Sequence, residues 1–283
     1  MVASSLEIRQ MSESELDAVL GWAAAEGWNP GLHDAACFHA ADPGGFLLGL
    51  IDGEPVASIF AVQYGAGFGF IGGYIVKPEW RGQGHGWAIW QAGMERLAGR
   101  NVGLDGVVAQ QANYARSGFR LAHRNFRYEG LSGAVAQESD QLVPLSALND
   151  DEILRYDRQF FPEQRSRFLQ AWLGQEQHIA LGILGAQGLA GYAVARPCRT
   201  GYKIGPLFAD TPALAEQLFA GLLSRLPAGE PVFLDVPELN PAAVALAERH
   251  QMQRCFETAR MYTGAQPELG MNRQYGITTF ELG

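Results

Sequence analysis

The hydrophobic and polar residues of the first 130 positions follow two different periods. Ser12 and Glu15 form a capping-box pattern, and the apolar spacing behind them predicts a helix to about Glu26. Alternating and β-branched runs elsewhere predict strands. In chain order we expect a strand at 6–11, helices at 12–26 and 32–41, strands at 46–51, 55–64 and 68–76, a helix after residue 86, a strand at 102–108, a short helix or turn at 109–117 and a strand at 121–128 that closes a first domain.

The same order of elements returns in the second half of the chain. The small, polar run Ser132 to Asp140 is typical of a linker. Beyond it we expect helices at 149–158 and 163–173, strands at 178–184, 188–195 and 202–208, a helix at 213–224, a strand at 232–236, a helix at 241–250 and strands at 254–262 and 275–280. The repeated order predicts a duplicated α/β fold, with domains at residues 1–131 and 141–283.

One stretch, FIGGYIVKPEWRGQGHG from Phe70 to Gly86, differs from an ordinary strand-to-helix connection. A β-branched and aromatic run reaches a proline and an arginine, three glycines alternate with polar residues, and a helix follows. A turn of this kind aims several backbone N–H groups at one point beside a helix N-terminus, which carries roughly +0.5 of an elementary charge. The stretch therefore predicts a pyrophosphate-binding turn.

Composition and charge narrow the classes of partner and substrate that the protein can have. The 283 residues carry a formal charge of −9, which argues against a nucleic-acid partner and favours an amine-bearing substrate, although charge that only maintains solubility explains it equally well. No apolar run reaches the roughly 18 residues of a membrane span, and the N-terminus has no signal-peptide order, so we expect a cytoplasmic protein without a membrane partner. Three widely spaced cysteines indicate reduced thiols and no metal site.

Two motifs together resemble the GNAT (GCN5-related) N-acetyltransferases. The run VKPEWRGQGHG at 76–86 is similar to the acetyl-coenzyme A signature of that family, and YARSGF at 114–119 is similar to its second hallmark. The run LDVPELN at 234–240 resembles a two-module type of the family. The resemblance implies tandem folds, each with a mostly antiparallel central sheet flanked by helices, and acetyl-coenzyme A as acyl donor without a metal.

The second half lacks the residues that bind the donor in such a family. Its run IGPLF at 204–208 matches IGGYI at 71–75, but Thr211 and Pro212 follow in place of the glycine turn. Gln251 and Met252 stand where the first half has Gly118 and Phe119. We therefore expect one active module and one degenerate module that does not bind the cofactor.

The resemblance also assigns roles to residues of the first half. The pyrophosphate cradle comprises Arg81, Gly82, Gln83, Gly84, His85 and Gly86, with Gln83 and His85 at its rim. The amides that pair with the pantetheine arm and polarise the thioester belong to Tyr74, Ile75 and Val76, and two further contacts come from Gln111 and Asn113. Tyr114 protonates the leaving thiolate, because a phenol with a pKa near 10 holds its proton at neutral pH.

The general base and the acceptor pocket are less well defined. The strand at 68–76 contains no acid, so Asp105 at the end of the next strand is the first candidate for the base, unless it caps a turn. Asp235 and Glu26 are weaker candidates, and a water-mediated route without a single essential acid is an equal alternative. By resemblance the acceptor pocket is lined by the first two helices and by Tyr74. This places Trp22, Trp28, His33 and Phe38 there, unless they belong to the core.

The sequence thus predicts an enzyme that transfers an acetyl group directly to a primary amine of a small-molecule or peptide-like acceptor. It would act as a monomer or homodimer, without an acetyl-enzyme intermediate. A longer acyl group stays open. The alternative from another class is a non-catalytic sensor that binds acyl-coenzyme A.

Overall fold

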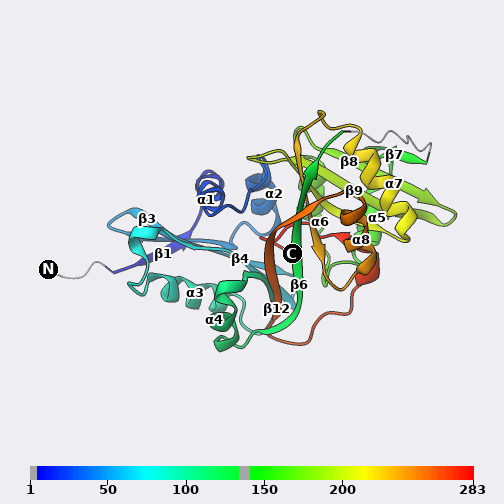
Figure 1. Ribbon diagram of the computed structural model, residues 1–283. Coiled ribbons are helices and arrows are strands. Elements are labelled where there is room, and N and C mark those ends of the chain that lie inside the picture. Colours follow the sequence, from blue (N-terminus) through cyan, green and yellow to red (C-terminus); the bar gives the residue numbers. More distant parts are fainter. Residues whose placement is uncertain (1–4, 134–140) are drawn as a thin grey trace.

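The computed structural model describes residues 5–133 and 141–283, so most of the expected linker lies outside the described residues. The strands form one mixed sheet that runs through both halves of the chain, in the order β1-β2-β3-β4-β5-β12-β6-β11-β10-β9-β8-β7, with β13 paired to β10. Helices cover both faces: in the first half α1 and α2 lie on one side of the sheet and α3 and α4 on the other (Figure 1). The expected α/β class with a mostly antiparallel sheet is confirmed.

The first half closely follows the predicted elements. Ser12 caps the first helix through a capping box with Glu15, as the sequence indicates. The elements are β1 (Glu7–Gln10), α1 (Glu13–Ala25), α2 (Asp34–Ala41), β2 (Phe46–Ile51), β3 (Glu54–Tyr64), β4 (Phe68–Val76), η1 (Pro78–Trp80), α3 (His85–Arg96), β5 (Asn101–Val107), η2 (Val108–Gln110), α4 (Gln111–Arg116) and β6 (Arg120–Leu131).

The second half repeats this order. Asn149 caps its first long helix with its side chain, and Thr211 caps the helix that follows the fourth strand of this half. The elements are β7 (Leu142–Pro144), η3 (Leu145–Ala147), α5 (Asp150–Asp157), α6 (Ser166–Leu173), β8 (Ile179–Gly185), β9 (Gly188–Pro197), β10 (Tyr202–Ala209), α7 (Pro212–Leu223), β11 (Pro231–Pro237), α8 (Pro241–Arg249), β12 (Gln253–Tyr262), η4 (Met271–Arg273) and β13 (Gln274–Gly276).

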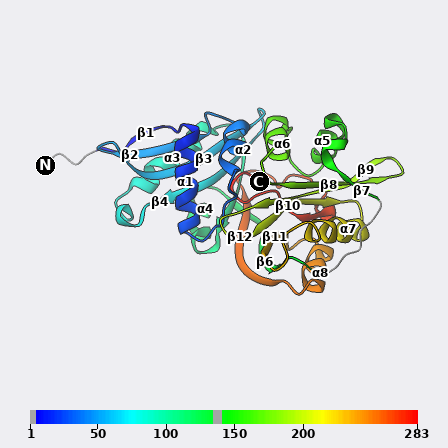
Figure 2. The same cartoon turned by 90° about the horizontal axis from the view of Figure 1, so that it is seen from above.

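The two halves exchange a strand. The expectation that the strand at 121–128 closes the first domain is wrong, because β6 pairs with β11 of the second half from Asn125↔Pro237 to Leu131↔Pro231. In return β12 pairs with β5 of the first half from Gly103↔Tyr262 to Val107↔Thr258. The two exchanged strands also pair with each other and run side by side through the middle of the molecule (Figures 1 and 2). The division near residues 131 and 141 therefore separates the two halves along the sequence, but strands of each half pair with strands of the other.

A shared hydrophobic core joins the halves on the side of α2 and α6. Phe38 of α2 is fully buried there, and its ring stacks on that of Trp172 of α6 with 6.4 Å between the ring centroids. The expected place of Phe38 in the acceptor pocket is therefore wrong, since its side chain is used to pack the halves together. Two further clusters of buried residues lie under α3 in the first half and under α7 and α8 in the second.

Candidate active site

The sheet opens between β4 and β5. These parallel strands pair from Phe68↔Asn101 to Ile71↔Leu104, and beyond this point no pairing joins them although both strands continue. A cavity of about 450 Å³ occupies the opening. Tyr74, Ile75 and Val76 of β4 line the cavity beyond the paired part of the strand.

The glycine turn lies at one end of this cavity. Gly82 and Gly84 have positive φ values of 75° and 90°, which residues with a side chain rarely adopt, and α3 begins directly after them at His85. Gly86 allows close packing, because an added Cβ would lie 2.7 Å from the hydroxyl oxygen of Tyr74. The Arg81 Nε donates to the carbonyl of Val76 at 2.8 Å, and its guanidinium forms an ion pair with Glu26. Strand, turn and helix follow in the predicted order.

Tyr114 faces the cavity from α4. Its ring stacks on Trp90 with 5.6 Å between centroids and lies against β5 at Gly106, where an added Cβ would be 2.2 Å from the Cε2 atom of the tyrosine. Burial, together with the neighbouring Tyr74 phenol, raises the pKa of Tyr114 to about 12. The phenol is therefore protonated at neutral pH and can donate a proton.

Asp105 also lines the cavity, but its carboxylate is already bonded. Its side chain is fully buried, and its two oxygens accept hydrogen bonds from Arg260 of β12 at 2.9 and 2.5 Å. Asn125 of β6 donates a third bond at 2.7 Å. This carboxylate joins β5 to the two exchanged strands, which is a structural arrangement that the sequence did not indicate.

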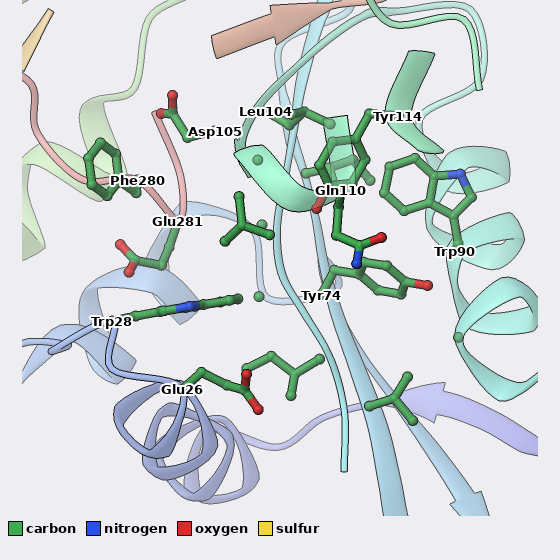
Figure 3. Close-up of a pocket in the computed structure, with 18 of the residues that line it drawn as sticks. Glu26, Trp28, Tyr74, Trp90, Leu104, Asp105, Gln110, Tyr114, Phe280 and Glu281 are labelled. Atoms are coloured by element: carbon green, nitrogen blue, oxygen red, sulfur yellow. The ribbon is translucent and has the colours of Figure 1, made fainter. Parts of the chain in front are cut away.

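Aromatic and acidic side chains form the other side of the cavity. Trp28, Phe280 and Glu281 face Tyr74, Tyr114 and Gln110 across the open space, and Glu26 lies at its edge (Figure 3). Phe256 of β12 completes this wall, with 6.2 Å between its ring centroid and that of Phe280. Of these wall residues the sequence predicted Trp28 in the acceptor pocket and named Glu26 only as a weaker candidate base, because the others carry no local motif.

Side chains of β6 and β10 hold Trp28 in place. Its carbonyl accepts hydrogen bonds from an Arg127 guanidinium nitrogen at 2.8 Å and from the Lys203 ammonium at 3.4 Å. Lys203 also donates to the carbonyl of Asn29 at 2.9 Å. Arg127 is in turn paired with Asp235 at 2.7 Å, and both are buried. The exchanged strand β6 and β10 of the second half thus fix the loop between α1 and α2 at the cavity.

The structure brings together most of the predicted site residues but not all. Ten of them line the cavity: Trp28, Tyr74, Ile75, Val76, Arg81, Gly82, Gly84, Gly86, Asp105 and Tyr114. Seven are not among the lining residues: Trp22, His33, Phe38, Gln83, His85, Gln111 and Asn113.

These seven residues have other surroundings. Trp22 packs against the shared core, with the Lys77 ammonium 5.2 Å from its ring centroid. His33 precedes α2 at its N-cap. The Gln83 amide donates to the carbonyl of Glu79, and the His85 ring lies 5.7 Å from that of Trp80, both beside the turn. Asn113 bonds to Gln110, which lines the cavity in place of Gln111 and Asn113.

The corresponding opening of the second half is filled by the chain itself. The parallel strands β10 and β11 pair only from Tyr202↔Val232 to Ile204↔Leu234, and beyond this point β13 pairs antiparallel with β10. The N–H of Ile277 donates to the carbonyl of Asp235 in β11 at 2.9 Å. The segment therefore lies in the place that is open between β4 and β5, which agrees with the missing glycine turn of this half.

None of the helices in residues 5–133 and 141–283 is long and apolar enough to cross a membrane. Within the same residues, His, Cys, Asp and Glu side chains form no group that could hold a metal ion.

Comparison with known proteins identifies the class. The "Acetyltransferase (GNAT) family" matches residues 9–119, and an "Acetyltransferase (GNAT) domain" matches residues 153–276. The holothin acyltransferase of a Pseudoalteromonas species is 32% identical over 272 residues, which cover 96% of this chain and 92% of that protein. The chain belongs to the GNAT acetyltransferase family and is an acyltransferase of the tandem type.

Solved structures share the complete tandem fold. A protein of Pyrococcus horikoshii described as an acetyltransferase superposes with a TM-score of 0.84 at 22% identity, over 98% of this chain and 96% of that one. A tandem GNAT protein from the clavulanic acid biosynthesis pathway superposes with a TM-score of 0.63 at 13% identity, over 93% of this chain and all of that one. These likenesses concern the fold.

Proposed function

We propose that the first half transfers an acetyl group from acetyl-coenzyme A to a primary amine of a small molecule by direct attack. One observation carries the proposal: the opening of the sheet between β4 and β5 lies next to the glycine turn, and Tyr114 faces the same cavity. A donor can thus be held at its pyrophosphate, along its pantetheine arm and at its thioester from a single cavity.

The pyrophosphate binds at the turn before α3. The turn lies at the N-terminus of a helix of 12 residues, where the unpaired backbone N–H groups of the first turn and the helix dipole favour an anion. Arg81 is exposed at this end and adds a positive charge. Gln83 and His85 lie beside the turn, in reach of the outer parts of the donor.

The thioester lies between β4 and Tyr114. Amides of Tyr74 to Val76 on the open edge of β4 donate to the carbonyl oxygen, which becomes negatively charged as the amine attacks. Removing one such donor costs about 3 kcal/mol of barrier in enzymes of this kind of chemistry. Tyr114 then gives its proton to the thiolate of coenzyme A as the carbon–sulfur bond breaks.

The acceptor binds on the aromatic side of the cavity. Trp28, Phe256 and Phe280 offer flat apolar faces, and Glu281 adds a carboxylate, which together suit a small, flat molecule that bears an amine. A relative that is similar over most of its length is named for the acylation of holothin, which also supports a small-molecule acceptor. A peptide-like amine is the alternative that an acceptor screen would distinguish.

Donor binding is tested by the thermal stability of the protein with acetyl-coenzyme A. We expect acetyl-coenzyme A to raise the Tm of the wild type and to have no effect on Gly84→Asp, which places a carboxylate in the anion site. Gly99→Asp is a matched control, because Gly99 also has a positive φ of 80°, is exposed and follows the opposite end of α3. An equal Tm rise in both variants would contradict the proposed donor site.

Turnover is tested by release of free thiol with a panel of small amines and short peptides. We expect Tyr114→Phe to lower kcat at least tenfold with an unchanged Tm response to acetyl-coenzyme A, because only the proton donor is removed. Tyr202→Phe in β10 of the second half serves as the control. A wild type that binds acetyl-coenzyme A but releases thiol with none of the amines would instead support the acyl-coenzyme A sensor.

A further inference from the structure

We propose that Glu281 is the general base of the reaction and that the final segment of the chain, residues 277–283, carries it into the active site of the first half. This inference rests on the proposed function and names a catalytic residue for it. No sequence motif marks Glu281, and Asp105 was the acid that the sequence favoured.

The final segment is held at both ends. It begins beside β13, where Ile277 donates to Asp235 of β11 at 2.9 Å. It then crosses into the first half, where the Tyr64 hydroxyl donates to the carbonyl of Leu282 at 3.2 Å. Arg165 donates to the carbonyl of Gly283 at 3.1 Å, and all residues from 277 to 283 are buried. A segment fixed in this way can place a side chain accurately.

Glu281 lies directly against the strand that is proposed to hold the thioester. Its carbonyl oxygen is so close to Gly72 of β4 that an added Cβ there would be only 2.0 Å away. Its side chain lines the cavity beside Trp28 and Phe280 (Figure 3). The Thr279 hydroxyl donates to one carboxylate oxygen and orients the group.

The other two acids of the cavity are already paired. Asp105 is bonded to Arg260 and Asn125 through both of its oxygens. Glu26 forms an ion pair with Arg81 at the edge of the cavity. Among the described residues Glu281 has no ion-pair partner, so its carboxylate is the one that an incoming ammonium or amine can meet.

Buried cations act electrostatically on Glu281. Arg127, paired with Asp235, and Arg196, paired with Asp34, both interact with its charge. Lys203 adds a third cation, whose pKa is lowered by burial and by Arg127, while Glu281 acts in the opposite direction.

The proton transfers balance with this assignment. Glu281 takes a proton from the bound ammonium, and the lone pair of the resulting amine attacks the thioester carbon to form a carbon–nitrogen bond. The nitrogen loses its second proton to water, the carbon–sulfur bond breaks, and the thiolate takes the proton of Tyr114. Glu281 then releases its proton to water and Tyr114 regains one, which restores the enzyme.

The test compares Glu281→Gln with Glu268→Gln, the same substitution at an exposed residue of the segment between β12 and β13. We expect Glu281→Gln to lower kcat/KM about a hundredfold at neutral pH, with an unchanged Tm response to acetyl-coenzyme A. The loss should shrink as the pH approaches the pKa of the acceptor amine, because a neutral amine needs less help. Glu268→Gln should behave as the wild type.

A Glu281→Gln enzyme with wild-type kcat/KM and an unchanged pH profile would overturn the assignment while the proposed function stands. A wild type that transfers to no amine would instead overturn the function. If Glu281→Gln does not fold, Glu281→Asp gives the answer, since it keeps the charge but shortens the reach. We expect at least a tenfold lower kcat with the pH profile of the wild type, and an unchanged kcat would contradict the role.

Discussion

The ion pair between Asp105 and Arg260 offers a direct test of whether Asp105 is structural or catalytic. Replacing Asp105 by asparagine keeps the size of the side chain and its bond with Asn125 but removes the charge opposite Arg260. We expect the variant to lose stability and, while folded, to keep its kcat within about tenfold, since the proposed base is another residue.

The expected loss follows from the burial of the pair. The Asp105 side chain is fully buried and that of Arg260 is 10% exposed, so the variant leaves a positive charge in the interior without a partner. Breaking such a pair costs about 3 to 5 kcal/mol of unfolding free energy. For a chain of this size each kcal/mol lowers the Tm by roughly 2 to 4 °C, which gives a decrease of about 6 to 20 °C.

Urea unfolding followed by tryptophan fluorescence measures the loss, and thiol release per folded molecule measures kcat. The double variant Asp105→Asn with Arg260→Met should recover at least half of the lost free energy, because it removes the unpaired charge as well. An Asp105→Asn variant of wild-type stability with a kcat lowered a hundredfold would refute this reasoning and restore Asp105 as the general base.

Two further predictions concern Gly106 and His123. Gly106→Ala places a methyl group 2.2 Å from the ring of Tyr114 and displaces that ring. We therefore expect kcat to fall about ten- to a hundredfold with little change in the Tm response to acetyl-coenzyme A. An unchanged kcat would show that the position of this ring does not matter for the reaction. Burial, aided by the charge of Arg260, lowers the pKa of His123 to about 3, so between pH 6.5 and 3 the unfolded chain binds a proton that the folded chain does not. The free energy of unfolding should therefore fall by about 1.4 kcal/mol for each pH unit of acidification in this range. Urea unfolding at several pH values should show a weaker pH dependence for His123→Asn than for the wild type. An equal pH dependence would assign the acid sensitivity to other groups.

Local patterns in the sequence predicted local structure well. The capping box of Ser12 and Glu15 lies within one helical turn, and the turn before α3 is formed by neighbouring residues. The positions of the glycines and of Tyr114 around the cavity follow from these short segments. The site was therefore predicted where a few consecutive residues determine the backbone.

Contacts between distant segments were not predictable in this way. An alternating strand pattern marks β6 but does not specify its neighbour, so the pairing of β6 with β11 was missed. Residues 275–280 were expected to form a strand, whereas β13 ends at Gly276 and the rest continues as a buried irregular segment. Glu281 and Phe280 were missed for this reason. Phe38 was misplaced because an aromatic residue on an amphipathic helix has the same pattern whether it faces a pocket or Trp172.

The exchanged strands affect how the protein is made. Asp105 of β5 meets Arg260 of β12 across 155 positions of the chain, so during synthesis β5 has an unpaired edge until β12 has left the ribosome. A fragment that ends near residue 131 would keep this open edge, together with a β6 that has lost both of its neighbours. The halves resemble a domain-swapped dimer joined into one polypeptide, and the first half depends on the late arrival of β12 from the second half.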